Sequence, residues 1–286
     1  MERIKTIGVL GGDTRQGVLA DLLADDGYTV IVSALDKLDS ISPRCFAGTV
    51  GEMAATAQVI VLPMPVSRDR VTLCAPFSYT PIYLSDIWPA VPQTSLVLGG
   101  MLKPPDTARF RWIDYAARDD FAIRNAVPTA EAALEIAIRE TDITLFGANC
   151  LVVGYGRIGK IMTAYLHALH AQVTATARKA SDLAQIRVSG ATPLATADIY
   201  TKAQQFDVII NTVPSPVLTR RELSKVKSGA IIIDLASPPF GVDFAAAEGL
   251  GLKAFSALSL PGKTAPRTAA GIIKDTITTI LREEEI

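Results

Sequence analysis

The stretch Leu151-Val152-Val153-Gly154-Tyr155-Gly156-Arg157-Ile158-Gly159 decides the fold of the second half of the chain. Its apolar start suits a parallel strand that is buried on both faces, and an amphipathic helix follows from about Ile158 to Leu169. In this GxGxxG spacing, the first glycine allows a tight turn, the second lets the backbone approach a pyrophosphate, and the third lets helix and strand pack closely. Free N–H groups and the helix dipole then favour the anion. We therefore expect a dinucleotide site that includes Gly154, Tyr155, Gly156, Arg157, Ile158 and Gly159.

The second strand of this half, Gln172 to Thr176, indicates which nicotinamide cofactor binds. Enzymes that use NAD place Asp or Glu near its end, where the carboxylate accepts from the adenosine 2′-OH. Here that place falls at or near Ala177, and no acidic residue occurs before Asp182. A guanidinium suits a 2′-phosphate through forked, charge-assisted hydrogen bonds. We expect NADP to be preferred over NAD, with contacts from Thr176, Arg178, Lys179 and Ser181.

Two later strands of this half also end in polar residues, at the edge that faces the ligand in open α/β sheets. The first is followed by Asn211, Thr212, Val213 and Pro214, which we expect at the nicotinamide end of the cofactor, although Asn and Pro also end strands without any ligand. The second ends at Asp234, which either caps the loop after it or acts as a catalytic base.

The first half opens with a similar pattern. The apolar run Thr6 to Leu10 ends at Gly11-Gly12-Asp13, and helical spacing follows from about Arg15 to Asp25. The turn lacks the GxGxxG spacing, but its N–H groups could meet a carboxylate at the start of the helix. We expect substrate contacts from Gly12, Asp13, Arg15 and Gln16.

A second candidate for holding substrate is the segment Leu260 to Pro266, which we expect to be a loop shaped by Pro and Gly. Lys263 is a candidate clamp for a carboxylate, or a catalytic proton carrier if it is desolvated, and Arg267 lies just beyond it. The two histidines, His167 and His170, have no acidic or cysteine partners in a ligand spacing, so no metal site is expected.

Length and composition set the frame for these motifs. The 286 residues, 49% of them apolar, predict about two domains, and the net charge of −1 argues against nucleic acid or an anionic membrane as partner. Three widely spaced cysteines fit a reducing cytosol, and no apolar run is long enough to span a membrane. We expect an α/β protein of two Rossmann-like domains with parallel sheets and a cleft between them, divided into residues 1–125 on the substrate side and 126–286 for the dinucleotide.

The expected elements follow from hydrophobic spacing. Pro128 begins a connecting helix, Thr129 to Ile138, after a break near 119–128, and a terminal helix near Thr268 to Arg282 packs back on the first domain. The acidic tip Glu283-Glu284-Glu285 is expected to be a solvated tail, and the six-proline stretch Pro63 to Pro92 an irregular excursion. Further strands are expected at Thr29–Ser33, Gln58–Leu62, Ser95–Leu98, Val208–Asn211, Ala230–Leu235 and Leu252–Phe255.

From about residue 5 to 275 the chain resembles the family of the dipicolinate synthase A-subunit. The specific matches are Gly11-Gly12-Asp13-x-Arg15-Gln16 at the start and Leu260-Pro261-Gly262-x-x-Ala265-Pro266 near the end. The intervening matches are Arg118–Ile123, Pro128–Glu131, GYGRIG at 154–159, Ala177-Arg178, Asn211–Pro214 and Asp234–Ser237. Residues 237–241, Ser-Pro-Pro-Phe-Gly, depart from the more basic, glycine-rich loop expected of the family.

The resemblance implies oxidation of a dihydrodipicolinate-level intermediate of lysine biosynthesis to dipicolinate, with NADP as acceptor. It also implies a flavoprotein-like B-subunit of dipicolinate synthase as partner and the mother-cell cytoplasm of a sporulating bacterium as location; a homo-oligomer is expected too. Two other functions stay open at this point: an NADP-dependent dehydrogenase of the hydroxy-acid or shikimate type, and a non-catalytic component that binds NADP and regulates a partner.

Overall fold

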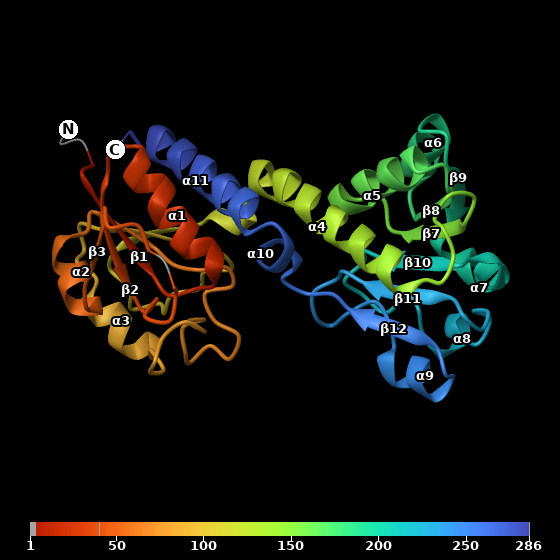
Figure 1. Cartoon of the computed structure of the whole chain (residues 1–286), viewed down its shortest axis with the longest axis horizontal. Helices are drawn as coiled ribbons and strands as arrows, with labels where there is room; N and C mark the ends of the chain where they lie inside the picture. Colours follow the sequence, from red (N-terminus) through yellow and green to blue (C-terminus); the bar gives the residue numbers. More distant parts are fainter. Residues whose placement is uncertain (1–3, 40, 286) are drawn as a thin grey trace. The chain divides into compact units, whose positions relative to one another are not determined.

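The structure is a computed structural model that describes residues 4–39 and 41–285 (Figure 1). The chain forms two units. Unit 1 takes the residues up to Asn125 and those from Pro261 onward, and unit 2 is Ala126–Leu260. The chain therefore leaves unit 1 once, completes unit 2, and returns to unit 1 with its C-terminal helix.

Each unit contains a parallel six-stranded sheet. In unit 1 the strand order is β3-β2-β1-β4-β5-β6, and in unit 2 it is β12-β11-β10-β7-β8-β9. Read from the opposite edge, the second order repeats the first. In both sheets the first three strands are added toward one edge and the next three toward the other, so the strand order changes direction between β1 and β4 and between β7 and β10. This arrangement confirms the predicted α/β class with parallel sheets, and it puts the carboxyl ends of the strands at the expected binding edge.

The elements of unit 1 follow one another along the chain in strand–helix units, and two helices connect this unit to unit 2. The strands are β1 (Thr6–Leu10), β2 (Thr29–Ser33), β3 (Cys45–Ala47), β4 (Val59–Val61), β5 (Leu96–Gly99) and β6 (Arg111–Asp114). The helices are α1 (Thr14–Asp25), α2 (Val50–Thr56), α3 (Leu84–Ala90), the 3-10 turn η1 (Tyr115–Ala117) and α11 (Pro266–Glu283), with α4 (Asp119–Glu140) and α10 (Leu260–Thr264) as the two connections.

Unit 2 is built in the same way. Its strands are β7 (Asn149–Val153), β8 (Gln172–Ala177), β9 (Thr192–Ala195), β10 (Val208–Asn211), β11 (Ile231–Asp234) and β12 (Lys253–Ser256). Its helices are α5 (Arg157–Ala168), α6 (Ala180–Val188), α7 (Ile199–Lys202), α8 (Arg220–Leu223) and α9 (Phe244–Gly249), with 3-10 turns η2 (Thr196–Asp198) and η3 (Ala203–Gln205).

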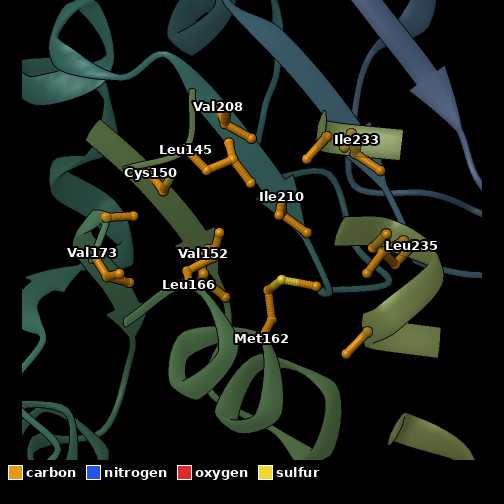
Figure 2. Close-up of a cluster of buried hydrophobic side chains, with 14 of the residues drawn as sticks. Leu145, Cys150, Val152, Met162, Leu166, Val173, Val208, Ile210, Ile233 and Leu235 are labelled. Carbon is orange, nitrogen blue, oxygen red and sulfur yellow. The ribbon is translucent and has the colours of Figure 1, made fainter. Parts of the chain in front are cut away.

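The central strands of unit 2 are apolar throughout because helices cover both faces of the sheet. Cys150 and Val152 point to one core, and Leu151 and Val153 point to the other. Figure 2 shows the first of these cores, where Met162 of α5 meets residues from several strands. Alternation along a strand sends neighbouring side chains to opposite faces, so an unbroken apolar run satisfies both.

Three expected elements differ in the structure. Helix α4 begins at Asp119, so Pro128 lies inside it and the expected break is absent. A proline inside a helix removes one hydrogen bond and costs about 3 kcal/mol. Here Phe121, Ala126 and Ala130 are buried along the same helix, and that burial offsets the cost.

The other two differences concern segments predicted as irregular. The segment from Leu260 is the short helix α10, and the proline-rich excursion contains helix α3 and a bridge between Thr72 and Tyr83. Strands β3 and β6 were not expected from the sequence, because edge strands are short and lie partly in solvent, so they carry little apolar pattern.

Helix α11 packs against α1 in unit 1 (Figure 1). Its buried face includes Ile272, Ile273, Ile277 and Ile280, which join the core of the first sheet. The helix thus completes one face of that sheet, which α1 alone would leave partly open to water.

The acidic tip of the chain is not a solvated tail. Arg118, just before α4, donates to both carboxylate oxygens of Glu283, at 2.6 and 3.1 Å, and also to Asp120. Arg111 of β6 pairs with Glu284. These ion pairs fix the end of α11 beside η1 and the start of α4.

We expect Glu283→Gln to lower the thermal midpoint of the chain slightly at neutral pH. Hydrogen bonds from Arg118 hold the pKa of Glu283 below its usual value of 4.5, so the stabilisation is complete above that value and fades as the pH falls through the lowered pKa. The difference from the unmodified protein should therefore vanish in acid. Thermal unfolding across this pH range measures it, with Glu285→Gln as the matched control, because Glu285 has no ion pair among the described residues. A difference that persists in acid would contradict the assignment.

Candidate functional site

The turn between β7 and α5 has the geometry that a dinucleotide requires. Gly154 has a φ of +95°, which favours glycine, and a Cβ on Gly159 would lie 2.1 Å from the carbonyl oxygen of Gly154. Only glycine at 159 lets the helix approach the strand so closely. A Cβ on Gly156 would meet nothing within 4 Å, so the turn is open on the side where a pyrophosphate would approach.

Two threonines hold this turn from neighbouring strands. The Thr176 hydroxyl of β8 accepts from the Gly154 N–H at 3.1 Å, and the Thr212 hydroxyl donates to the Val153 carbonyl at 2.9 Å. Thr176 is fully buried, and its side chain supports Gly154, while its expected contact with the cofactor stays a prediction. Thr212 is half-buried, and its Oγ1 would lie 2.7 Å from a Cβ added to Gly154, so it also excludes larger residues there.

The remaining residues of the glycine motif divide by exposure. Arg157 is exposed at the first position of α5, whereas Ile158 packs partly on the core. Tyr155 is half-buried, and the Lys160 ammonium lies 5.6 Å from the centre of its ring. The start of α5 therefore combines free space at Gly156 with two nearby cations, Arg157 and Lys160.

The end of β8 lies next to the glycine turn. Val153 pairs with Thr176, so Gly154 is level with Ala177, and Arg178 comes one residue later. Arg178, Lys179 and Ser181 are all exposed, and no hydrogen bond or ion pair of Arg178 occurs within the described part of the chain. Ala177 is buried and carries no acid toward this edge.

Asp234 is the centre of a buried polar network. Its carboxylate accepts from the Asn211 side chain at 2.7 Å and from the N–H groups of Ala236, Gly241 and Val242 at 2.9 to 3.1 Å. Asp234 is fully buried, and all four donors belong to the protein. The side chain caps the loop after β11, which is the first of the two roles expected for it. Its role as a catalytic base stays a prediction.

Asn211 is used in the same network. Its amide also donates to the carbonyl of Val213, and its oxygen accepts from the Val213 N–H. The amide therefore shapes the turn that presents Val213 and the exposed Pro214. The expected contact between the Asn211 side chain and the cofactor stays a prediction. Gly241 completes the arrangement, since a Cβ there would lie 2.2 Å from the Asn211 amide nitrogen.

At the equivalent edge of unit 1, an ion pair closes the first turn. Asp13 caps α1, and Arg15 donates to both of its oxygens at 2.8 Å and to the Met64 carbonyl at 2.8 Å. Burial acts to lower the pKa of Arg15, but the hydrogen bonds and charge of Asp13 outweigh it and raise that pKa. Arg15 is 4% exposed, so its charge is neutralised inside the protein.

The expected anion cradle of backbone N–H groups is absent from this turn. Gly11 donates to the Ser33 carbonyl and Gly12 to the Cys74 carbonyl. The side chain of Gln16 is different: it is 2% exposed, and its amide nitrogen has no partner among the described residues. The Gln16 side-chain amide is thus a hydrogen-bond donor at the carboxyl edge of the first sheet that a ligand could use.

Helix α10 rests on the ion pair. A Cβ on Gly262 would lie 2.8 Å from an Asp13 carboxylate oxygen and 2.9 Å from the Arg15 Nε, so only glycine fits there. Lys263 and Arg267 follow and are exposed. The Lys263 ammonium is thus exposed in this structure, and its expected role as a carboxylate clamp or proton carrier stays a prediction.

Sequence reasoning did not predict the packing contacts of Gly262, Gly241 and Tyr115, which support these edges. Burial raises the pKa of Tyr115, whose hydroxyl donates to the Leu62 carbonyl at 3.3 Å. A lone tyrosine or glycine carries no local pattern, so spacing could not identify them. Over the described ranges, no group of three or more His, Cys, Asp or Glu side chains could hold a metal, and no helix is long and apolar enough to cross a membrane.

The chain is similar to known proteins over almost its whole length. Residues 6–110 match the family model of the N-terminal domain of the dipicolinate synthase A-subunit, and residues 124–241 match the NAD-binding domain of D-isomer specific 2-hydroxyacid dehydrogenases. The dipicolinate synthase A-subunit of Bacillus subtilis is 31% identical over 97% of this chain and 96% of its own length.

Two solved structures are similar over the same length. The crystal structure of the dipicolinate synthase A-subunit from Bacillus halodurans has a TM-score of 0.90 at 32% identity and covers 97% of both chains. The crystal structure of its counterpart from Bacillus subtilis has a TM-score of 0.88 at 31% identity, covering 99% of this chain and 97% of that one. The match to the NAD-binding domain indicates a nicotinamide dinucleotide as cofactor.

Alanine substitutions at Gly159 and Gly156 should have different effects, the first on stability and the second on dinucleotide binding. Gly159→Ala forces a Cβ against backbone and should lower the free energy of unfolding by about 1–3 kcal/mol. Gly156→Ala adds its Cβ in open space and should change stability by less than about 1 kcal/mol, yet weaken dinucleotide binding at least about tenfold. Denaturant unfolding and cofactor titration measure the two effects. A Gly156→Ala variant that binds as well as the unmodified chain would move the pyrophosphate away from this turn.

Proposed function

The chain belongs to the family of the dipicolinate synthase A-subunit, and on that premise we propose that it oxidises a dihydrodipicolinate-level intermediate to dipicolinate with NADP as acceptor. The observation that carries the proposal is the open glycine turn at β7, with Arg178 one residue beyond the level of that turn and no acid at Ala177. A bound nicotinamide supplies the hydride acceptor. The dihydropyridine ring would lose one hydride to that acceptor and one proton to solvent water, and it would become aromatic, which makes the step downhill.

The chain itself must bind the cofactor and a dicarboxylate. Arg157 and the start of α5 bind the pyrophosphate, and Arg178, with Lys179 and Ser181, binds the 2′-phosphate. Val213 and Pro214 form the surface beside which the nicotinamide lies. Residues placed in this way would accelerate the hydride transfer mainly by holding the reacting carbon of the substrate next to the nicotinamide ring.

We assign the substrate carboxylates to unit 1. The Gln16 amide supports this, because a donor left unpaired when buried costs about 1–3 kcal/mol unless a ligand or water accepts from it. Lys263 of α10 and Arg267 at the start of α11 supply exposed positive charge. Asp13 and Arg15, whose charges cancel, act as positioning residues that seat α10 through Gly262. The B-subunit of dipicolinate synthase serves as partner, as the name of the relatives suggests.

Turnover by the purified chain tests the reaction. We expect NADPH and dipicolinate to form together when NADP and dihydrodipicolinate are supplied, by absorbance and by product identification. The Gly156→Ala variant, which should stay folded, is the control without cofactor binding. If activity appears only after the B-subunit is added, this chain binds the cofactor and the B-subunit completes the site at which dihydrodipicolinate is oxidised. Tight NADP binding without dipicolinate in either case would show that the chain is non-catalytic and overturn the proposal.

We expect NADP to bind more tightly than NAD by roughly 10- to 150-fold, because charge-assisted contacts to a phosphate are worth about 1.5–3 kcal/mol. Arg178→Ala should remove most of this preference and leave NAD binding almost unchanged, since only NADP carries the phosphate. Adding Ala177→Asp should invert the preference by supplying a partner for the 2′-OH. Titrations of both cofactors at fixed ionic strength measure it. Equal affinities in the unmodified chain, or loss of both cofactors in Arg178→Ala, would refute the assignment.

A further inference from the structure

One face of unit 2 is apolar, hollow and open to water. Residues of α4 and α5 line a hollow of about 670 Å³, which includes Leu134, Ile138, Tyr165 and Leu169. A second hollow of about 510 Å³ adjoins it and shares Ile138 and Leu169 with the first. We call this the α4–α5 face.

Large apolar side chains project from this face. Phe146 is 71% exposed, Ile138 58% and Ile143 45%. All three line the second hollow, so the exposure is contiguous. A monomeric protein rarely leaves such a group of side chains in water, and an apolar patch with a charged rim is typical of an interface.

The charges along α4 are complementary to a second copy of themselves. Glu131, Glu135 and Arg139 line the hollow at four-residue intervals, so they form one row on the helix. If two α4 helices cross antiparallel about a twofold axis at Glu135, each Glu131 meets the Arg139 of the other copy. The two Glu135 side chains then approach each other, but each is already paired with Arg139 of its own chain. The guanidinium has five N–H donors, so Arg139 can keep its bond to Glu135 and also donate to Glu131 of the other copy.

The shape of the α4–α5 face and the net charge of the chain also fit a second copy of the chain as the partner. A twofold interface needs both a projection and a hollow on the same surface, and the α4–α5 face has Phe146 beside its two hollows. The net charge of −1 gives two copies almost no long-range repulsion. From these observations we propose that the α4–α5 face is the interface of a homodimer in which two α4 helices pair antiparallel. This inference does not depend on the proposed reaction.

The mass of the full chain in solution tests the interface. We expect about twice the 30.4 kDa of one chain by light scattering and sedimentation velocity. Phe146→Asp should give a folded monomer with an unchanged circular dichroism spectrum, because the side chain is mostly exposed in one chain and buried only in the dimer. Its thermal midpoint should fall by no more than the loss of association removes. Val188→Asp is the matched control: Val188 lies on α6, is 89% exposed and lines neither hollow, so its variant should stay dimeric.

A charge exchange tests the pairing of the helices. Arg139→Glu should raise the dimer dissociation constant at least about tenfold, since the contact occurs twice. Adding Glu131→Arg should restore it, and circular dichroism confirms that each variant is folded. An unmodified chain that stays monomeric at tens of micromolar, a Phe146→Asp variant that still dimerises, or a double exchange without rescue would each overturn the proposal. A monomer that binds a different protein through Phe146 would reassign the face to that partner.

Discussion

Burial of parallel strands from both faces is the constraint on which the rest of this structure depends. Helices cover each sheet, so the strands must be apolar and can carry polar side chains only where they end. The glycine turn at Gly154, the network at Asp234 and the ion pair at Asp13 all lie at such ends. The chemistry of the protein is therefore concentrated at the carboxyl edges of its two sheets.

The two units use the same strand order in different ways. In unit 2, the protein's own hydrogen bonds saturate the ends of β10 and β11 but leave the space beside Gly156 open. In unit 1, the first turn is closed by Arg15 and Asp13, with α10 seated on them. One edge has the open glycine turn typical of dinucleotide sites, whereas the first turn of the other is filled by an ion pair, with the exposed cations Lys263 and Arg267 after Gly262. This division suits a reaction in which one unit holds the cofactor and the other the acid.

Several residues with catalytic side-chain chemistry serve the fold. Asp234 holds four N–H or amide donors, Asn211 is shared between that carboxylate and the Val213 backbone, and Thr176 supports Gly154. A buried polar group must be fully hydrogen-bonded, so the protein uses its most polar side chains to fix loops that are otherwise mobile. Thr176 holds the glycine turn directly, and the Asn211–Asp234 network places Thr212 and Val213 beside it.

The sequence alone determined the fold class, the glycine turn and the positions of the long central strands, because buried strands and tight turns leave a local pattern of apolar residues and glycines. It also located Arg178 at the end of β8, since that position follows from counting along the motif. Only the tertiary structure decided that α4 continues through Pro128 and that Glu283 pairs with Arg118. It also decided that Asp234 accepts from the Asn211 side chain and that Arg15 donates to the Met64 carbonyl. These outcomes depend on residues far apart in the sequence, and whether a charged side chain is free or paired is set by neighbours that no local spacing reveals.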